Sequence, residues 1–279
     1  MKWRIGDVTI TQFIEIDTLG GKEYILPQAT PEALRRLDWL CPHFADQAGR
    51  IRMTIHSFLV ETPTRRIVVD TGIGNDKQNR EQQIWNGRQG PFLADLAAAG
   101  CPADTIDTVL CTHLHVDHVG WNTIHSDGRW VPTFRNARYL MGRVEFDHWK
   151  NVRAPAPAAI FDDSVRPVAD AGLVDLIEAG HPVCDEFTVL ATPGHSPGHF
   201  SIHVRSRGEE ALLLADVAHH PCQMVHLDWC STIDFDPAQA IRTRHELFSR
   251  FAGRPTLVLA GHFIGGTILR DGEAFRLAM

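Results

Sequence analysis

Short apolar runs, separated by polar and glycine-rich segments, recur along the whole chain. In the first quarter these runs are rich in Val, Ile and Thr and fall at residues 8–11, 53–60 and 67–69. Their length and β-branched character are typical of strands. A second group of the same kind falls at residues 187–191, 200–204, 212–215 and 257–260. The pattern therefore predicts two groups of strands, one in each half of the chain.

Helix start and stop signals lie between these runs. Thr30 followed by Pro31 predicts a helix that continues to about Leu40, because Thr caps helices and proline suits their first turn. Residues 91–99 predict a second helix, which ends at Gly100. Residues 236–253 predict a third, with Asp236 as its cap and Gly253 as its end. Strands followed by a helix, twice over, suggest two sheets packed face to face with helices outside.

The stretch from about 119 to 186 shows little clean periodicity. It contains Trp121, Trp130, Trp149 and the segment 154–157, which reads Ala-Pro-Ala-Pro. We expect an irregular insertion over one end of the sheets. A chain of 279 residues is within the size of a large α/β unit, so residues 1–279 are expected to form a single domain.

Composition and charge narrow the possible classes of protein. Lys and Arg number 27 against 34 Asp and Glu, a net charge of −7, and no basic run stands out, which argues against nucleic-acid binding. No segment approaches the roughly 18 apolar residues of a membrane span, and the first residues lack an export signal. A cytoplasmic protein with no membrane partner is expected. The six cysteines are scattered, which favours reduced thiols.

Histidine is unusually frequent, and the positions of the histidines indicate which chemistry the protein performs. Four ligand-type residues gather just after the apolar run 109–111, namely His113, His115, Asp117 and His118. In an extended segment alternate side chains share a face, so His113 and His115 can bind one ion. The turn that follows allows Asp117 and His118 to bind at a neighbouring position. The pattern predicts a metal site.

Three further candidate ligands each follow an apolar run. His195, Asp216 and His262 come shortly after the predicted strands that end near 191, 215 and 260. Loops at one edge of a sheet bring such side chains together. Taken with the histidine cluster, they indicate a site built from several segments.

The sequence resembles the metallo-β-lactamase superfamily over essentially the whole chain. The motifs that carry the resemblance are Asp70 in Val-Asp-Thr-Gly, the cluster at 113–118, His195, Asp216 and His262. The resemblance implies an αββα sandwich of two mixed β-sheets flanked by helices. It also implies two divalent metal ions, with His113, His115 and His195 on one, Asp117, His118 and His262 on the other, and Asp216 bridging them. Asp70 would fix the loop of a ligand. Zinc is the default metal, and iron, manganese or cobalt suit the same donors.

Within the superfamily, the chain is similar to the N-acyl homoserine lactonases and the methyl-parathion hydrolase-like proteins. Asp216 stands where the β-lactam-cleaving branch has Cys, and residues 214–223 look like the second group. The resemblance implies a hydrolase that opens lactones or cleaves esters of small molecules with a hydroxide shared by the two ions. Two alternatives remain open, a phosphotriester or phosphodiester hydrolase on the same metals and a metal-binding module without catalysis.

Roles for other residues follow from the same resemblance. Asp117 is the expected proton shuttle. His219 stands where lactonases tend to place Tyr, and it either hydrogen-bonds the substrate or only orients Asp216. Apolar residues near the motifs are expected to line the substrate pocket, namely Ile73, Trp121, Met224, Trp229 and Phe263. The oligomeric state stays open, with a homodimer as one option.

Overall fold

The computed structural model describes residues 1–20 and 24–279. Internal contacts divide the chain into two compact units. The first unit contains residues 1–15 and 55–186, and the second contains residues 16–54 and 187–279. Each unit has its own hydrophobic core. That residues 1–279 form a single domain stays a prediction.

A seven-stranded mixed sheet forms the frame of the first unit, in the order β1-β2-β3-β4-β5-β8-β9. Strand β1 pairs with β2 and β3 with β4 in antiparallel fashion, whereas β4, β5, β8 and β9 run parallel to one another. The strands are β1 (Lys2–Ile5), β2 (Val8–Leu19), β3 (Arg52–Glu61), β4 (Arg66–Val69), β5 (Thr108–Cys111), β8 (Arg138–Gly142) and β9 (Val174–Ile177).

Strand β5 lies in the middle of this parallel set, and all four of its residues are buried. Parallel strands are usually covered on both faces, which explains the unbroken apolar run. Helix α2 (Phe92–Ala98) packs Phe92 and Leu96 into the same core cluster as Val109. The first unit also holds η2 (Gln83–Trp85) and η3 (Ala103–Thr105).

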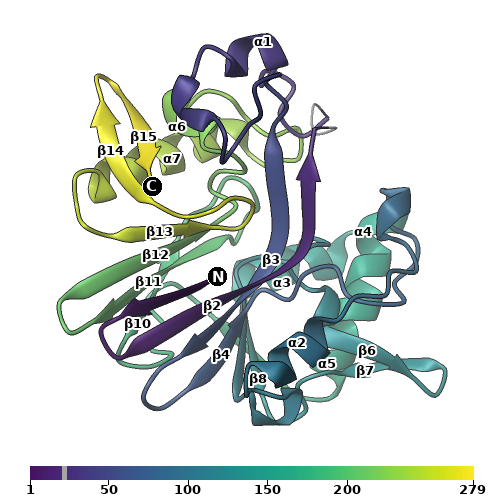
Figure 1. The fold of residues 1–279 in the computed structure, drawn as a ribbon. Helices are drawn as coiled ribbons and strands as arrows, with labels where there is room; N and C mark the ends of the chain where they lie inside the picture. The colour runs from purple at the N-terminus through teal and green to yellow at the C-terminus, as the bar shows by residue number, and fades with distance from the viewer. Residues whose placement is uncertain (21–23) are drawn as a thin grey trace. The chain divides into compact units, whose positions relative to one another are not determined.

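The stretch 119–186 is more regular than the sequence indicated. It supplies strands β8 and β9 to the large sheet, because the apolar run 139–141 pairs in register with β5. Figure 1 shows its helices and hairpin gathered beside β8. The other elements are η4 (Gly120–Asn122), the hairpin of β6 (Thr123–Ser126) and β7 (Arg129–Pro132), α3 (Arg143–Asn151), α4 (Pro155–Ile160), the π-helix η5 (Phe161–Val165) and α5 (Arg166–Asp170).

A four-stranded sheet, β10-β11-β12-β13, forms the frame of the second unit. The first three strands are antiparallel and β13 joins β12 in parallel. Helix α7 packs Leu247, Phe248 and Phe251 into the core of this unit. The elements are α1 (Pro31–Leu34), η1 (Asp38–Leu40), β10 (Phe187–Ala191), β11 (Phe200–Ser206), β12 (Glu209–Ala215), α6 (Cys222–Val225), α7 (Pro237–Phe251), β13 (Leu257–Ala260), β14 (Thr267–Asp271) and β15 (Ala274–Ala278).

Most predicted elements are confirmed, and one helix is shorter than expected. Asp236 caps α7 by accepting from the backbone N–H of Gln239 at 2.9 Å. The helix expected to run to Leu40 ends at Leu34 and resumes as the short η1. The break at Leu37 lets Leu34 and Leu40 both enter the core of the second unit. Among the described residues, no helix combines the length and the apolar character that a bilayer crossing requires.

Candidate metal centre

In the first unit, the loop that follows β5 brings two imidazoles close together, with their rings edge to face. His113 Nε2 and His115 Nδ1 lie 3.1 Å apart, and His113 is fully buried. Neutral imidazole has one nitrogen lone pair available to accept a proton or a metal. Two such nitrogens pointing at a common place, on alternate residues of an extended loop, are suited to binding one ion.

Asp70 holds this loop from the end of β4. Its Oδ1 accepts from the backbone N–H of Thr112 at 2.7 Å, and its Oδ2 accepts from Thr112 Oγ1 and His118 Nδ1, each at 2.8 Å. The carboxylate can only accept, so His118 carries its proton on Nδ1. The other ring nitrogen, His118 Nε2, lies 3.8 Å from Asp117 Oδ1. This arrangement orients a ligand through its second nitrogen.

A buried glutamate that the sequence analysis did not single out supports the same loop. Glu145, in the first turn of α3, is 1% exposed. Its Oε1 accepts from the backbone N–H of Leu114 at 3.1 Å and from Trp149 Nε1 at 2.6 Å. The Trp149 ring lies edge-on to His115, with ring centroids 5.3 Å apart. The spacing of Glu145 and Trp149, four residues apart on one helix face, was the available signal.

In the second unit, three imidazoles surround one carboxylate oxygen. Asp216 directly follows β12 and is 2% exposed. Its Oδ2 lies 2.9 Å from His262 Nε2, 3.4 Å from His219 Nε2 and 3.5 Å from His195 Nε2. The ligand atoms of His195, Asp216 and His219 all lie within 4.8 Å of one another.

Two of these histidines are anchored through their other nitrogen. His195 Nδ1 lies 2.9 Å from Asp234 Oδ1, and His262 Nδ1 lies 2.8 Å from the carbonyl oxygen of Thr54. Both acceptors require a proton on Nδ1, which leaves the lone pair on Nε2, the side that faces Asp216. The sequence analysis missed Asp234, since nothing local connects it with a histidine 39 positions earlier.

His219 differs from its two neighbours. It is 1% exposed, and within the described chain neither ring nitrogen makes a hydrogen bond. Burial lowers the pKa of His219 to about 3, so the ring is neutral. Gln223 Oε1 accepts from its backbone N–H at 2.7 Å, and its ring stacks on His262 with centroids 5.4 Å apart. The backbone is held, but no partner selects which nitrogen carries the proton.

The residues of each unit fit a divalent metal ion. Each set combines imidazoles with carboxylates, and its nitrogens and oxygens lie within a few ångströms of one another. Burying unpartnered ring nitrogens such as those of His219 costs free energy, which a ligand or substrate contact would offset. Imidazole and carboxylate donors suit zinc and also iron, manganese or cobalt.

The expected pocket residues are mostly deep in the protein. Trp121 belongs to the core of the first unit, and Met224 and Phe263 belong to the core of the second. Ile73 is fully buried, whereas Trp229 is half-buried and stacks on His226 with ring centroids 4.0 Å apart. Their place in a substrate pocket stays a prediction.

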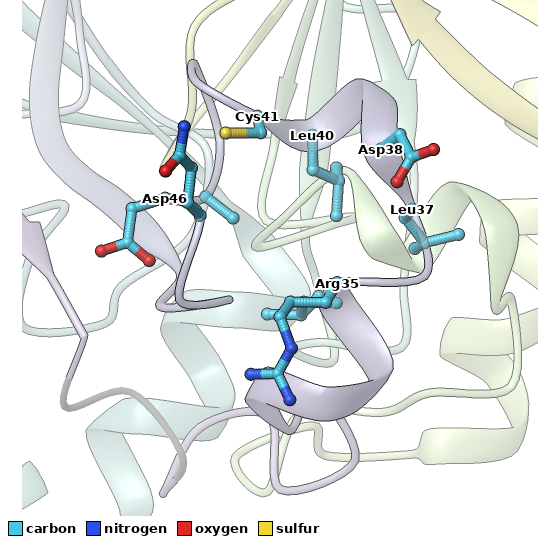
Figure 2. Close-up of a pocket in the computed structure, with 9 residues that line it drawn as sticks. Arg35, Leu37, Asp38, Leu40, Cys41 and Asp46 are labelled. Atoms are coloured by element: carbon cyan, nitrogen blue, oxygen red, sulfur yellow. The ribbon is translucent and has the colours of Figure 1, made fainter.

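Figure 2 shows a cavity of the second unit that has a different lining. Its volume is about 250 Å³, and Arg35, Asp38, Cys41 and Asp46 surround it together with Leu34, Leu37, Leu40, Ala45 and Gln47. No expected metal ligand or pocket residue is among these lining residues. The cavity is therefore not the substrate pocket that the sequence analysis expected.

Comparison with protein families identifies the group to which these motifs belong. The model of the metallo-beta-lactamase superfamily matches residues 51–262, more than half of the chain. The chain belongs to the metallo-beta-lactamase superfamily. This match begins with β3 and ends at His262, so it covers every candidate ligand described above. The mixed α/β fold class expected from the sequence is confirmed.

Three other proteins are similar to this chain along most of their length. N-acyl homoserine lactonase AiiA of Bacillus thuringiensis subsp. kurstaki is 24% identical over 226 residues, which cover 77% of this chain and 83% of that protein. The structure of AidC, a dizinc quorum-quenching lactonase, has a TM-score of 0.82 at 21% identity and covers 100% of this chain and 96% of its own. The hydrolase AbOPH has a TM-score of 0.79 at 24% identity, covering 99% and 95%.

Proposed function

We propose that this superfamily member is a dinuclear metal-dependent hydrolase that opens lactones or cleaves carboxylic esters. The observation that carries the proposal is a shared pattern at three histidines. His118, His195 and His262 each bind a protein acceptor through Nδ1 at 2.8–2.9 Å, which leaves Nε2 for a metal. Metal-ligating histidines almost always have such an outer partner, whereas surface histidines have no need of one.

The proposed ligand set follows the superfamily motifs. His113, His115 and His195 would hold one ion, Asp117, His118 and His262 the other, and Asp216 would contact both. A purely structural zinc needs only four ligands, so seven candidates favour a pair of ions. Zinc is the proposed metal, since AidC, a neighbour in fold, is described as a dizinc lactonase.

The ions and the chain contribute different parts of the proposed reaction. When bound, the two ions supply a nucleophilic hydroxide at neutral pH and polarise the carbonyl group of the substrate. Asp117, half-buried beside His118, would carry the proton from the attacking water to the leaving alkoxide. His219 would donate a hydrogen bond to the substrate, a role for which its unanchored ring nitrogens are available.

Proton release by metal-replete protein in a weakly buffered solution tests the proposal. The substrates are acyl homoserine lactones, simple γ- and δ-lactones, an aryl ester and a phosphotriester, each repeated after chelation. We expect turnover of a lactone or ester class that chelation abolishes. Turnover of the triester alone would favour phosphoryl transfer, and no turnover by protein that carries about two metal ions would favour a binding role.

Replacing Asp117 by Asn tests the proton-transfer role. Asn keeps the shape of the side chain but cannot accept the proton at neutral pH, so we expect kcat to fall by about 100-fold or more. Metal content measured by mass spectrometry separates this effect from loss of an ion. Near-normal turnover by Asp117→Asn with both ions present would contradict the role.

A further inference from the structure

A cavity of about 340 Å³ lies in the first unit, between the end of α3 and the segment that contains α4 and η5. This volume is within the range of small-molecule sites. Its lining residues come from two neighbouring stretches of chain, namely Trp149, Lys150, Asn151, Val152, Arg153, Ala158, Phe161, Asp162 and Arg166. None of them has a role in the proposed function.

Trp149 connects this cavity with the candidate metal ligands. The same indole that lines the cavity lies edge-on to His115, with ring centroids 5.3 Å apart. Its Nε1 donates to Glu145 Oε1 at 2.6 Å, and that oxygen also accepts from the backbone N–H of Leu114 in the ligand loop. A molecule in the cavity that touches Trp149 is thus one indole ring away from His115.

The lining of the cavity combines apolar side chains with positively charged ones. Trp149, Val152 and the buried ring of Phe161 form apolar surface. Arg166 is paired with Asp162 at 2.6 Å and lies over the Phe161 ring at 5.3 Å. This pairing neutralises the only carboxylate of the lining.

Two other cations of the lining, Lys150 and Arg153, form no ion pair with any carboxylate in the part of the chain that the structure describes, and the chain has a net charge of −7. Arg153 is exposed, and its Nη1 donates to the carbonyl oxygens of Lys150 and Val152 at 3.0 and 3.2 Å. These bonds hold the guanidinium in place. A planar guanidinium above apolar walls is suited to a carboxylate on an apolar body.

We propose that this cavity binds a carboxylate carried by the acyl part of the substrate, so that the enzyme prefers anionic lactones or esters to neutral ones. The inference rests on the proposed function for its reaction, and on the cavity for its selectivity. Trp149 and Phe161 would contact the apolar part of the acyl group, and Arg153 with Lys150 would bind its carboxylate.

A matched substrate pair tests the selectivity. The two substrates are N-acyl lactones of equal chain length, one ending in a carboxylate and the other in a primary amide. We expect Arg153→Met to lower kcat/KM about fivefold for the carboxylate, mainly through KM, and less than twofold for the amide, as expected for one exposed charge pair. Arg135→Met, an exposed arginine of the same unit outside the lining, is the control and should change neither value.

Binding measured without turnover separates this inference from the proposed function. The probe is 4-phenylbutyrate, compared with its amide by calorimetry, before and after chelation. Binding that survives chelation and weakens in Arg153→Met supports the cavity, even if no lactone is hydrolysed. Binding that disappears on chelation and is unchanged in Arg153→Met would place the carboxylate on the metal ions. That result, or metal-dependent turnover of both substrates at equal kcat/KM, would overturn the inference.

Discussion

At the scale of single residues, Asp70 shows how one buried carboxylate orients a candidate metal ligand. It is 6% exposed and accepts three hydrogen bonds, two from Thr112 and one from His118. All three donors belong to the ligand loop or lead into it. Asp70 thus sets both the position of the loop and the tautomer of His118.

Replacing Asp70 by Asn tests this positioning role. The amide keeps the volume of the carboxylate but turns an N–H group toward one of its donors, so we expect metal affinity to fall 10- to 100-fold. Metal retained after dialysis against graded chelator concentrations measures the change. Asp127→Asn, at an exposed turn, is the control, and equal retention by the two variants would contradict the role.

His219 gives a second test at this scale. If its ring contacts the substrate, His219→Phe should lower kcat by about 100-fold while the metal content stays the same. His226→Phe, a half-buried histidine nearby that keeps a ring on Trp229, should have nearly normal activity. A His219→Phe variant with both metals and an unchanged rate would show that this imidazole only packs against Asp216 and His262.

At the scale of elements, one buried lysine joins several pieces of the first unit. Lys77, in the loop after β4, is fully buried and donates to Thr123 Oγ1 at 2.6 Å and to the carbonyl oxygen of Asp163 at 3.2 Å. Its Nζ lies 3.7 Å from the ring centroid of Trp130. These contacts tie the loop to β6, β7 and η5, three elements within the stretch expected to be irregular.

The pKa of Lys77 makes this junction sensitive to pH. Burial lowers that pKa from 10.5 to about 7, so between these values the unfolded chain binds more protons than the folded one. The free energy of unfolding should therefore rise with pH across this window, by up to about 1.4 kcal/mol per pH unit. Below pH 7, where Lys77 is protonated in both the folded and the unfolded chain, this group should not make the free energy of unfolding depend on pH.

Urea unfolding at pH 7, 8 and 9 measures this contribution. In Lys77→Met the rise that depends on Lys77 should disappear, so the difference between wild type and variant should grow in favour of wild type as pH increases. Lys150→Met, at an exposed lysine, should keep the pH dependence of the wild type. Parallel curves for wild type and Lys77→Met would contradict the lowered pKa.

Elements with strong local signals were predictable, and elements defined by pairing were not. Helix α7 was readable because Asp236 and Pro237 mark its start and Gly253 its end, all within the segment itself. Strand β8 was missed because its place depends on register with β5, a partner outside the stretch, and β9 was missed because it pairs in turn with β8. Local propensity cannot report such a pairing.

At the scale of the whole molecule, binding of the proposed ions would contribute to the stability of the fold. If ions bind the folded chain and not the unfolded one, their removal must lower its stability. We expect chelation to lower the Tm by roughly 5 °C or more, and added zinc to restore it. Calorimetry on the same sample with and without metal measures this shift, and an unchanged Tm after complete metal loss would contradict binding at the proposed ligands.

By itself, the sequence determined the class of chemistry. His113, His115, Asp117 and His118 lie within six positions, so their chain spacing alone brings donor atoms together whatever the rest of the fold does. The strands before His195, Asp216 and His262 were equally predictable from the sequence, because each has its own apolar run. These local patterns were sufficient to predict the superfamily and a metal-dependent hydrolase.

The tertiary structure decided how each candidate ligand is held. Asp234 reaches His195 across 39 positions, and the carbonyl oxygen of Thr54 reaches His262 across 208. The same holds for Glu145 under the ligand loop and for the cavity beside Trp149. A hydrogen bond depends on distance and direction in space, and residues this far apart acquire both only when the sheets and helices between them have packed.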